Sequence, residues 1–199
     1  MMKRMGHCRD LAALVATVTV LAAAGCSGGG PPDEPDPPQA QQVALRVESV
    51  TGADRLDEDT RTEVEGAVGK VLSAYVVDAF LGTFPREEFV RSFESFTSDA
   101  ARDAARDIDR LTAAGVPDAT AMRATELDVG LSFLTTGRTV HGATAKVHFT
   151  FEATTEDGST QPLTLDGRFL LVAEPDGWSV FGYDVRFDNG DGVPVEAES

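Results

Sequence analysis

Cysteine and histidine side chains carry out much of protein chemistry, and both residues are scarce in this chain. The two cysteines, Cys8 and Cys26, lie within the first 26 residues. The rest of the chain therefore has no thiol for a disulfide, a zinc site or a cysteine nucleophile. His141 and His148 have no clustered carboxylate at ligand spacing, so we predict no metal site. We place His148 on a solvated face of cross-strand charges, with Asp128, Lys146, Glu152, Asp166 and Arg168 as its expected members.

An acidic segment near the C-terminus resembles the start of a calcium-binding loop. Counted from Asp188, glycine occupies the third and fifth ligand positions, and Ser199 stands at the twelfth, where a bidentate Glu is required. The loop therefore lacks the oxygen ligands that calcium needs. The sequence also has no phosphate-binding glycine loop. We predict no cofactor and interpret residues 189–199 as a flexible acidic tail.

The balance of charge restricts the class of partner. The chain has 17 basic and 33 acidic residues and a formal net charge of −16. Removing the residues before Cys26, which include three basic side chains and one acidic one, leaves 14 basic and 32 acidic residues, a net charge of −18. Nucleic acids and anionic lipid headgroups are bound through clusters of Lys and Arg. We therefore exclude nucleic acid as a partner.

Two helices are predicted at the start of the folded part of the chain. Apolar residues at helical spacing follow Asp57 and Asp59, either of which can cap the first helix, and Gly82 ends it. Pro85 is a favourable first residue for the second helix. Its apolar face contains Phe89 and Phe93.

A third helix is predicted from its cap to a pair of breakers. Thr97 or Ser98 caps its start, and the Gly and Pro of segment 113–117 end it. The residues expected on its inward face are Ala101, Ala104, Ala105, Ile108 and Leu111.

The second half of the chain alternates between apolar and polar residues. The apolar faces fall within Leu127–Phe133, Ala145–Phe151, Leu163–Leu171 and Trp178–Val185, with turns at Gly137, Gly158 and Gly177 between them. Four such strands, each with one polar face, predict an α+β domain in which three N-terminal helices pack on a curved four-stranded antiparallel sheet.

The last strand departs from this pattern, because both of its faces are partly apolar. Phe181 and Tyr183 share one face, and Trp178 and Val180 share the other. We interpret the second apolar face as the site of an extra covering element or of a homodimer.

The sequence Leu21-Ala22-Ala23-Ala24-Gly25-Cys26 resembles a bacterial lipobox, in which the cysteine is acylated, with palmitate for example, and becomes the mature N-terminus. The apolar run 11–24 would span about 21 Å as a helix, short of the roughly 30 Å hydrocarbon core of a bilayer. A cleaved lipoprotein signal peptide over 1–25 is therefore favoured over a transmembrane helix. Secretory cleavage without lipidation of Cys26 is the alternative.

The predicted organisation follows from this division. Residues 26–42 comprise the lipidated Cys26 and a Gly- and Pro-rich segment without apolar periodicity, which is typical of a disordered tether. Residues 43–188 form the folded domain. We expect the protein to be attached by its lipid anchor to the extracytoplasmic face of the cell membrane.

Several short motifs are similar to those of uncharacterised actinobacterial lipoproteins with an NTF2-like domain, also described as SnoaL-like or cystatin-related. They are the segments 78–82, 96–101, 107–112 and 177–180, and the resemblance covers roughly residues 45–190. It implies an NTF2-like cone of helices and curved sheet. That family includes isomerases, cyclases, dehydratases and many non-catalytic binding domains, so the resemblance does not choose a function.

The resemblance also implies where a catalytic site would lie. An NTF2-like enzyme holds an Asp base, or a His–Asp pair, with a Tyr acid inside the cone. The candidates are Tyr75 with Asp78 on the first helix and Tyr183 with Asp184 on the last strand. We favour the interpretation that Tyr75 fills the core and Asp78 faces solvent, so no residue is assigned as catalytic.

These observations lead us to expect a non-enzymatic, lipid-anchored domain. It would bind a small apolar ligand or act as an accessory to a cell-envelope complex. An isomerase- or cyclase-type enzyme that uses a buried Asp with a Tyr is the alternative, and it requires a buried carboxylate whose pKa is strongly raised. A homodimer formed through the outer sheet face is a further hypothesis about its partners.

Overall fold

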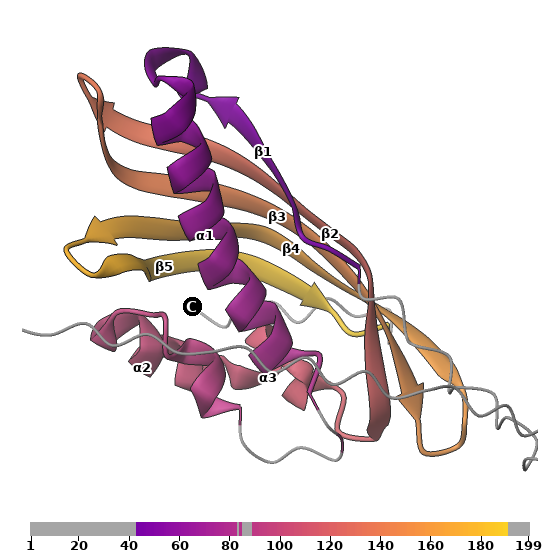
Figure 1. Cartoon of the computed structure of the whole chain (residues 1–199). Coiled ribbons are helices and arrows are strands. Elements are labelled where there is room, and N and C mark those ends of the chain that lie inside the picture. The colour runs from indigo at the N-terminus through magenta and orange to yellow at the C-terminus, as the bar shows by residue number, and fades with distance from the viewer. Residues whose placement is uncertain (1–42, 83, 85–88, 191–199) are drawn as a thin grey trace, which may run out of the picture. The chain divides into compact units, whose positions relative to one another are not determined.

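A computed structural model describes residues 43–82, 84 and 89–190 of the chain (Figure 1). The described residues all belong to one compact unit. The predicted signal peptide, Cys26 and the tether lie outside the described residues, as does most of the predicted tail. No helix among the described residues is both long and apolar enough to span a membrane.

The described residues form one sheet in the order β1-β2-β3-β4-β5, which therefore has β1 and β5 as its edges. The strands are β1 (Arg46–Thr51), β2 (Ala119–Thr136), β3 (Thr139–Thr155), β4 (Thr160–Glu174) and β5 (Gly177–Asp188). β2 to β5 pair antiparallel, whereas β1 pairs with β2 in parallel. The tight turn between β2 and β3 uses Gly137 at a positive φ of 62°, which glycine adopts without steric cost.

The sheet corrects the predicted fold class. A four-stranded, purely antiparallel sheet is wrong, because β1 makes a fifth strand and a parallel pair. β1 also precedes every helix, so the expected order of helices first and strands second is wrong as well. The signal for β1 is present in the sequence, since Val43, Leu45 and Val47 alternate with Arg46 and Glu48.

The long helix α1 (Glu58–Ala79) lies across one face of the sheet, which we call the inner face (Figure 1). Asp57 is its N-cap, and the Asp57 carboxylate accepts a hydrogen bond from the Thr60 N–H at 2.9 Å. One stripe of the helix is buried and packs toward the sheet. Its members are Val64, Val68, Leu72, Tyr75, Val76 and Ala79.

The other two predicted helices take a different form. The second is replaced, within the described residues, by the 3-10 turn η2 (Val90–Phe93). The third is divided at Asp107 into α2 (Ser98–Arg106) and α3 (Ile108–Leu111), followed by the short 3-10 turn η3 (Ala113–Gly115). Ala100 and Ala104 are buried on α2, whereas Ala105 is exposed, which corrects the predicted inward face.

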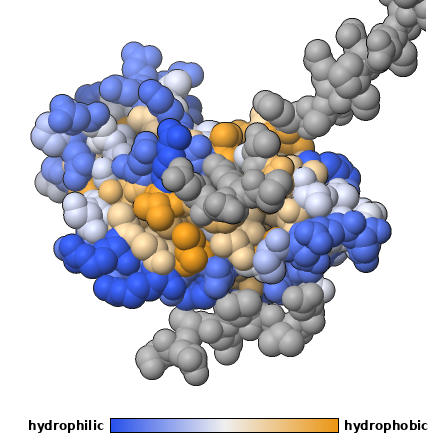
Figure 2. Space-filling view, turned by 90° about the horizontal axis from the view of Figure 1, so that it is seen from below, coloured by the Kyte–Doolittle hydropathy of each residue, from blue (hydrophilic) through white to orange (hydrophobic). Residues whose placement is uncertain are grey.

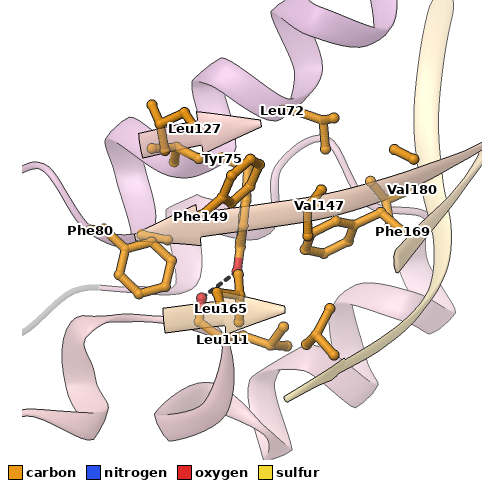
Figure 3. Close-up of a cluster of buried hydrophobic side chains, with 14 of the residues drawn as sticks. Leu72, Tyr75, Phe80, Leu111, Leu127, Val147, Phe149, Leu165, Phe169 and Val180 are labelled. Atoms are coloured by element: carbon orange, nitrogen blue, oxygen red, sulfur yellow. Dashed lines mark hydrogen bonds between the residues drawn. The ribbon is translucent and has the colours of Figure 1, made fainter. Parts of the chain in front are cut away.

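The space between α1 and the inner face is filled by large side chains (Figure 3). Tyr75, Phe80, Phe149 and Phe169 are each at most 1% exposed. The ring of Tyr75 meets that of Phe169 edge-on, with 5.1 Å between ring centroids. The inward residues predicted for β2, β3 and β4 are almost all buried here, so the predicted strand phases agree with the structure.

A β-bulge accounts for the two partly apolar faces of β5. Leu170 of β4 pairs with Gly182, but Leu171 pairs with Val180, so Phe181 is an extra residue without an opposite partner. The insertion shifts the alternation, and both Val180 and Val185 therefore face the core. Phe181 is left 51% exposed at the edge of the sheet. The bulge thus gives a local cause for the two apolar faces, and the covering element and the homodimer stay predictions.

Candidate functional site

The structure does not bring Tyr75 and Asp78 together as an acid and a base. The Tyr75 hydroxyl is buried and donates to the Leu111 carbonyl at 2.5 Å (Figure 3). Burial raises the pKa of Tyr75 well above its ordinary value. Asp78 lies half-buried at the end of α1, and its backbone carbonyl accepts a hydrogen bond from the Ser92 hydroxyl at 2.7 Å. Tyr75 thus joins α1 to α3 within the core.

Tyr183 and Asp184 point to opposite faces of β5, as the alternation predicts. The Asp184 side chain is 71% exposed on the outer face and accepts a hydrogen bond from Arg168 at 2.8 Å. Among the described residues, the buried polar side chains other than Tyr75 are Ser92, Thr112 and Thr155, and none of them is a carboxylate. The isomerase-type alternative therefore lacks the buried carboxylate that it requires within the described part of the chain.

Tyr183 is paired instead with Asp107, a residue that lies 76 positions away in the sequence. The Tyr183 hydroxyl donates to Oδ2 of Asp107 at 2.8 Å, and Nη1 of Arg110 lies 3.4 Å from the same oxygen. A second guanidinium nitrogen of Arg110 donates to the Val185 carbonyl at 2.9 Å. These three side chains, which we call the Tyr183 cluster, attach α3 to β5.

The chemistry of the Tyr183 cluster favours a positioning role. Burial, followed by the hydrogen bond to Asp107, raises the pKa of Tyr183 far above its ordinary value. The phenol therefore stays protonated and acts as a donor at physiological pH. Arg110 is only 15% exposed, and its Nε is buried without a hydrogen-bond partner among the described residues. Its guanidinium is held in place chiefly by the contacts to Asp107 and Val185.

An open cleft of about 720 Å³ lies beside the Tyr183 cluster, between α2, α3 and β5. We call it the edge cleft, because β5 is an edge strand of the sheet. Figure 1 shows α2 and α3 alongside β5, where a further strand would otherwise lie. Its lining combines charged, aromatic and small side chains: Ala100, Asp103, Arg106, Asp107, Arg110, Phe181, Gly182, Tyr183 and Asp184.

Two other surface depressions are more apolar. One, of about 440 Å³, lies between the segment 43–45, α1 and β2 and is lined mainly by Val43, Leu45, Val76, Leu81 and Leu127. The other, of about 520 Å³, lies on the outer face of the sheet and includes Leu134, Val172 and Phe181. We call them the α1 groove and the outer groove.

The underside of the molecule also carries apolar surface. Figure 2 views it from the side on which Figure 1 places α2 and α3, and shows apolar residues in its middle, bordered by hydrophilic ones. A smaller depression of about 230 Å³, lined in part by Phe84, Phe89 and Val116, is built from the segments on either side of α2 and α3.

The outer face beyond the outer groove is a ladder of charges, as predicted for His148. His148 lies directly opposite Asp128 on one side and Asp166 on the other. Nδ1 of His148 lies 2.6 Å from Oδ1 of Asp166, and this hydrogen bond raises the pKa of His148. Arg46 of β1 binds Asp128, with 2.6 Å between Nε and Oδ1, and lowers the pKa of that carboxyl.

The sequence predicts Tyr183 as a candidate site residue but does not predict its partners Asp107 and Arg110. Asp107 and Arg110 were assigned to a continuous helix, and the break at Asp107 that turns both toward β5 has no strong breaker residue to mark it. Among the described residues, no group of three or more His, Cys, Asp and Glu side chains is arranged to hold a metal ion. Asp188 closes a turn by accepting from the Gly190 N–H at 3.0 Å, while Asp191 and Gly192 lie outside the described residues.

Comparison of the chain with protein-family models, with curated proteins and with solved structures finds no match. The resemblance to NTF2-like lipoproteins therefore stays a prediction that rests on the short motifs alone.

Proposed function

We propose that this protein is a lipid-anchored, extracytoplasmic binding domain that serves as an accessory to a cell-envelope complex. The observation that carries the proposal is the filled interior. Tyr75, Phe80, Phe149 and Phe169 occupy the space in which an enclosed active site would have to lie. A domain built in this way recognises its partner with its surface, where the edge cleft, the α1 groove and the outer groove lie.

The proposed localisation of the protein rests on its N-terminal sequence. Cys26 follows an apolar run and precedes a segment that cannot pack, an arrangement that suits an acylated cysteine on a tether. Metabolic labelling with an alkyne fatty acid tests this directly, because Cys8 supplies a matched control. We expect label on the wild-type chain and on Cys8→Ser, and loss of label and of membrane association in Cys26→Ser. Equal labelling of Cys26→Ser would contradict the lipid anchor.

Binding of a small apolar ligand is a second candidate function, favoured by the α1 groove. Val43, Leu45, Val76, Leu81 and Leu127 give it a mainly apolar lining, and its volume of about 440 Å³ falls within the range of small-molecule sites. Native mass spectrometry of the protein purified from its own bacterium separates the two candidates. A retained small molecule supports the ligand function, and an empty domain that retains an envelope protein supports the accessory function.

A further inference from the structure

The outer edge of β5 is paired along only part of its length. The Val180 N–H donates to the Ser95 carbonyl at 2.9 Å, and the Val180 carbonyl accepts from the Thr97 N–H at 2.8 Å, so segment 95–97 forms a short parallel bridge. Further along, Arg110 covers the Val185 carbonyl. Edge strands are usually covered to prevent pairing with other chains, and here both ends of a short stretch are covered.

The backbone of Tyr183 lies between these two covered points. In an antiparallel ladder, the N–H and C=O of alternate residues point toward the neighbouring strand, and those of the residues between point away from it. The Val185 carbonyl points away from β4, toward Arg110, so Tyr183, two residues earlier, presents its own N–H and C=O in the same direction. Among the described residues outside the sheet, no group forms a hydrogen bond with either. Tyr183 lines the edge cleft.

The side chains around the Tyr183 backbone determine which partner side chains the cleft favours. The bulge leaves the Phe181 ring exposed beside the cleft. Asp103 and Asp184 also line the cleft and are exposed, and each forms one ion pair within the chain, with Arg106 at 2.6 Å and with Arg168 at 2.8 Å. Arg110 is already bound to Asp107 and Val185. An exposed aromatic ring beside carboxylates suits a guanidinium or ammonium group, through cation–π contact and ion pairing.

We propose that the edge cleft binds an extended segment of a partner polypeptide that carries an Arg or Lys side chain, and that this segment pairs with the backbone of Tyr183. Segment 95–97 shows that the same edge accepts an extended chain in parallel orientation. Addition of a strand to an edge supplies affinity through the main chain and selectivity through the flanking side chains. The inference rests on the proposed binding function and identifies the surface and the partner class that serve it.

The test uses a synthetic peptide of alternating Arg and Val residues, added to the full chain in detergent. Hydrogen–deuterium exchange is followed over residues 181–185. We expect the peptide to slow exchange there. A copy that is N-methylated at every residue has no backbone N–H on either edge, so it cannot complete the backbone pairing and should give no protection. A Glu–Val copy should bind more weakly. Equal protection by the N-methylated copy would overturn backbone pairing, and equal protection by the Glu–Val copy would overturn the preference for basic side chains.

A matched pair of variants on α2 locates the site. Asp103 and Asp99 are both exposed and both pair with the Arg three residues later, but only Asp103 lines the cleft. Asp103→Trp should obstruct the cleft and weaken peptide binding about tenfold or more, whereas Asp99→Trp should leave binding unchanged. Equal binding by the two variants, or no protection of residues 181–185 in the wild type, would overturn the inference. Protection confined to the outer groove would also overturn it and leave the binding function intact.

Discussion

Tyr75 and Tyr183 are both hydrogen-bond donors, but their surroundings differ. Tyr75 is buried and donates to a backbone carbonyl of α3, whereas Tyr183 is half-buried and donates to the Asp107 carboxylate. Removal of the Tyr75 hydroxyl leaves the Leu111 carbonyl buried, while Asp107 can turn to water and keeps Arg110. The two hydroxyls should therefore differ in their contributions to stability.

Tyr75→Phe should lower the free energy of unfolding by about 1–3 kcal/mol, and Tyr183→Phe by about 1 kcal/mol. Urea unfolding followed by circular dichroism measures both. A larger loss for Tyr183→Phe than for Tyr75→Phe would show that the Tyr183 cluster, rather than the core hydrogen bond, is the stronger attachment of α3.

His148 gives a prediction about pH. Its hydrogen bond to Asp166 raises the pKa of the folded imidazole above its unfolded value, so the protonated form stabilises the fold. This contribution is fully present below the unfolded pKa of about 6.5 and is lost as pH rises through the folded pKa. Because the side chain is 48% exposed, the contribution should stay below about 1 kcal/mol.

The measurement is an NMR titration of the His148 ring in the wild type and in Asp166→Asn. We expect the substitution to lower the pKa of His148 toward its ordinary value. Asp157→Asn is the control, since that carboxylate lies in the β3–β4 turn and binds Thr155 and Ser159. An unchanged pKa in Asp166→Asn would show that Asp166 is not the partner that protonated His148 requires.

Between β4 and β5, Gly167 lies at a close approach of the two backbones. Gly167 has a φ of 141°, and a Cβ at this position would lie 2.2 Å from the Asp184 carbonyl oxygen. Gly66 of α1 differs, since a Cβ there would meet no atom within 4 Å. The same substitution should therefore have opposite effects at the two sites.

Gly167→Ala should destabilise the protein by about 2 kcal/mol or more. The positive φ disfavours a side chain, and the Asp184 carbonyl oxygen occupies the place of its Cβ. Gly66→Ala should stabilise it by about 0.5–1 kcal/mol through helix propensity. Thermal unfolding of the two variants beside the wild type tests this. Stabilisation by Gly167→Ala would mean that β4 and β5 are not as close as described.

Some features of the strands could be predicted from the sequence, and others could not. Alternation in Ala145–Phe151 and Leu163–Leu171 gave the correct inward faces, because burial on one side leaves a period-two pattern. The strand β1 was not predicted, because the sequence of a short edge strand next to a Pro-rich segment resembles the end of a tether. The bulge at Phe181 was not predicted, because one inserted residue shows in the sequence only as apolar residues on both faces of the strand. The Tyr183–Asp107 pair depends on long-range packing, which local patterns do not contain.

We propose a whole molecule of three parts: a lipid anchor at Cys26, a tether and a folded domain. The structure describes the folded domain, which has a filled core and open surface clefts. The outer face separates charge from apolar surface, with the His148 ladder at one end and the outer groove at the other. The net charge of −18 that remains without the residues before Cys26 favours partners that present basic groups. The edge cleft, with Asp103 and Asp184 beside Phe181, is the surface where we expect such a partner to bind.

Photo-crosslinking in the living bacterium tests this claim most directly. A photoreactive amino acid replaces Asp103 in one strain and Asp99 in another, so that both probes lie on α2 but only one lines the edge cleft. We expect one discrete adduct with an envelope protein from position 103 and none from position 99. Adducts from position 99 alone, or no adduct from position 103 in a strain whose protein is correctly anchored, would contradict it.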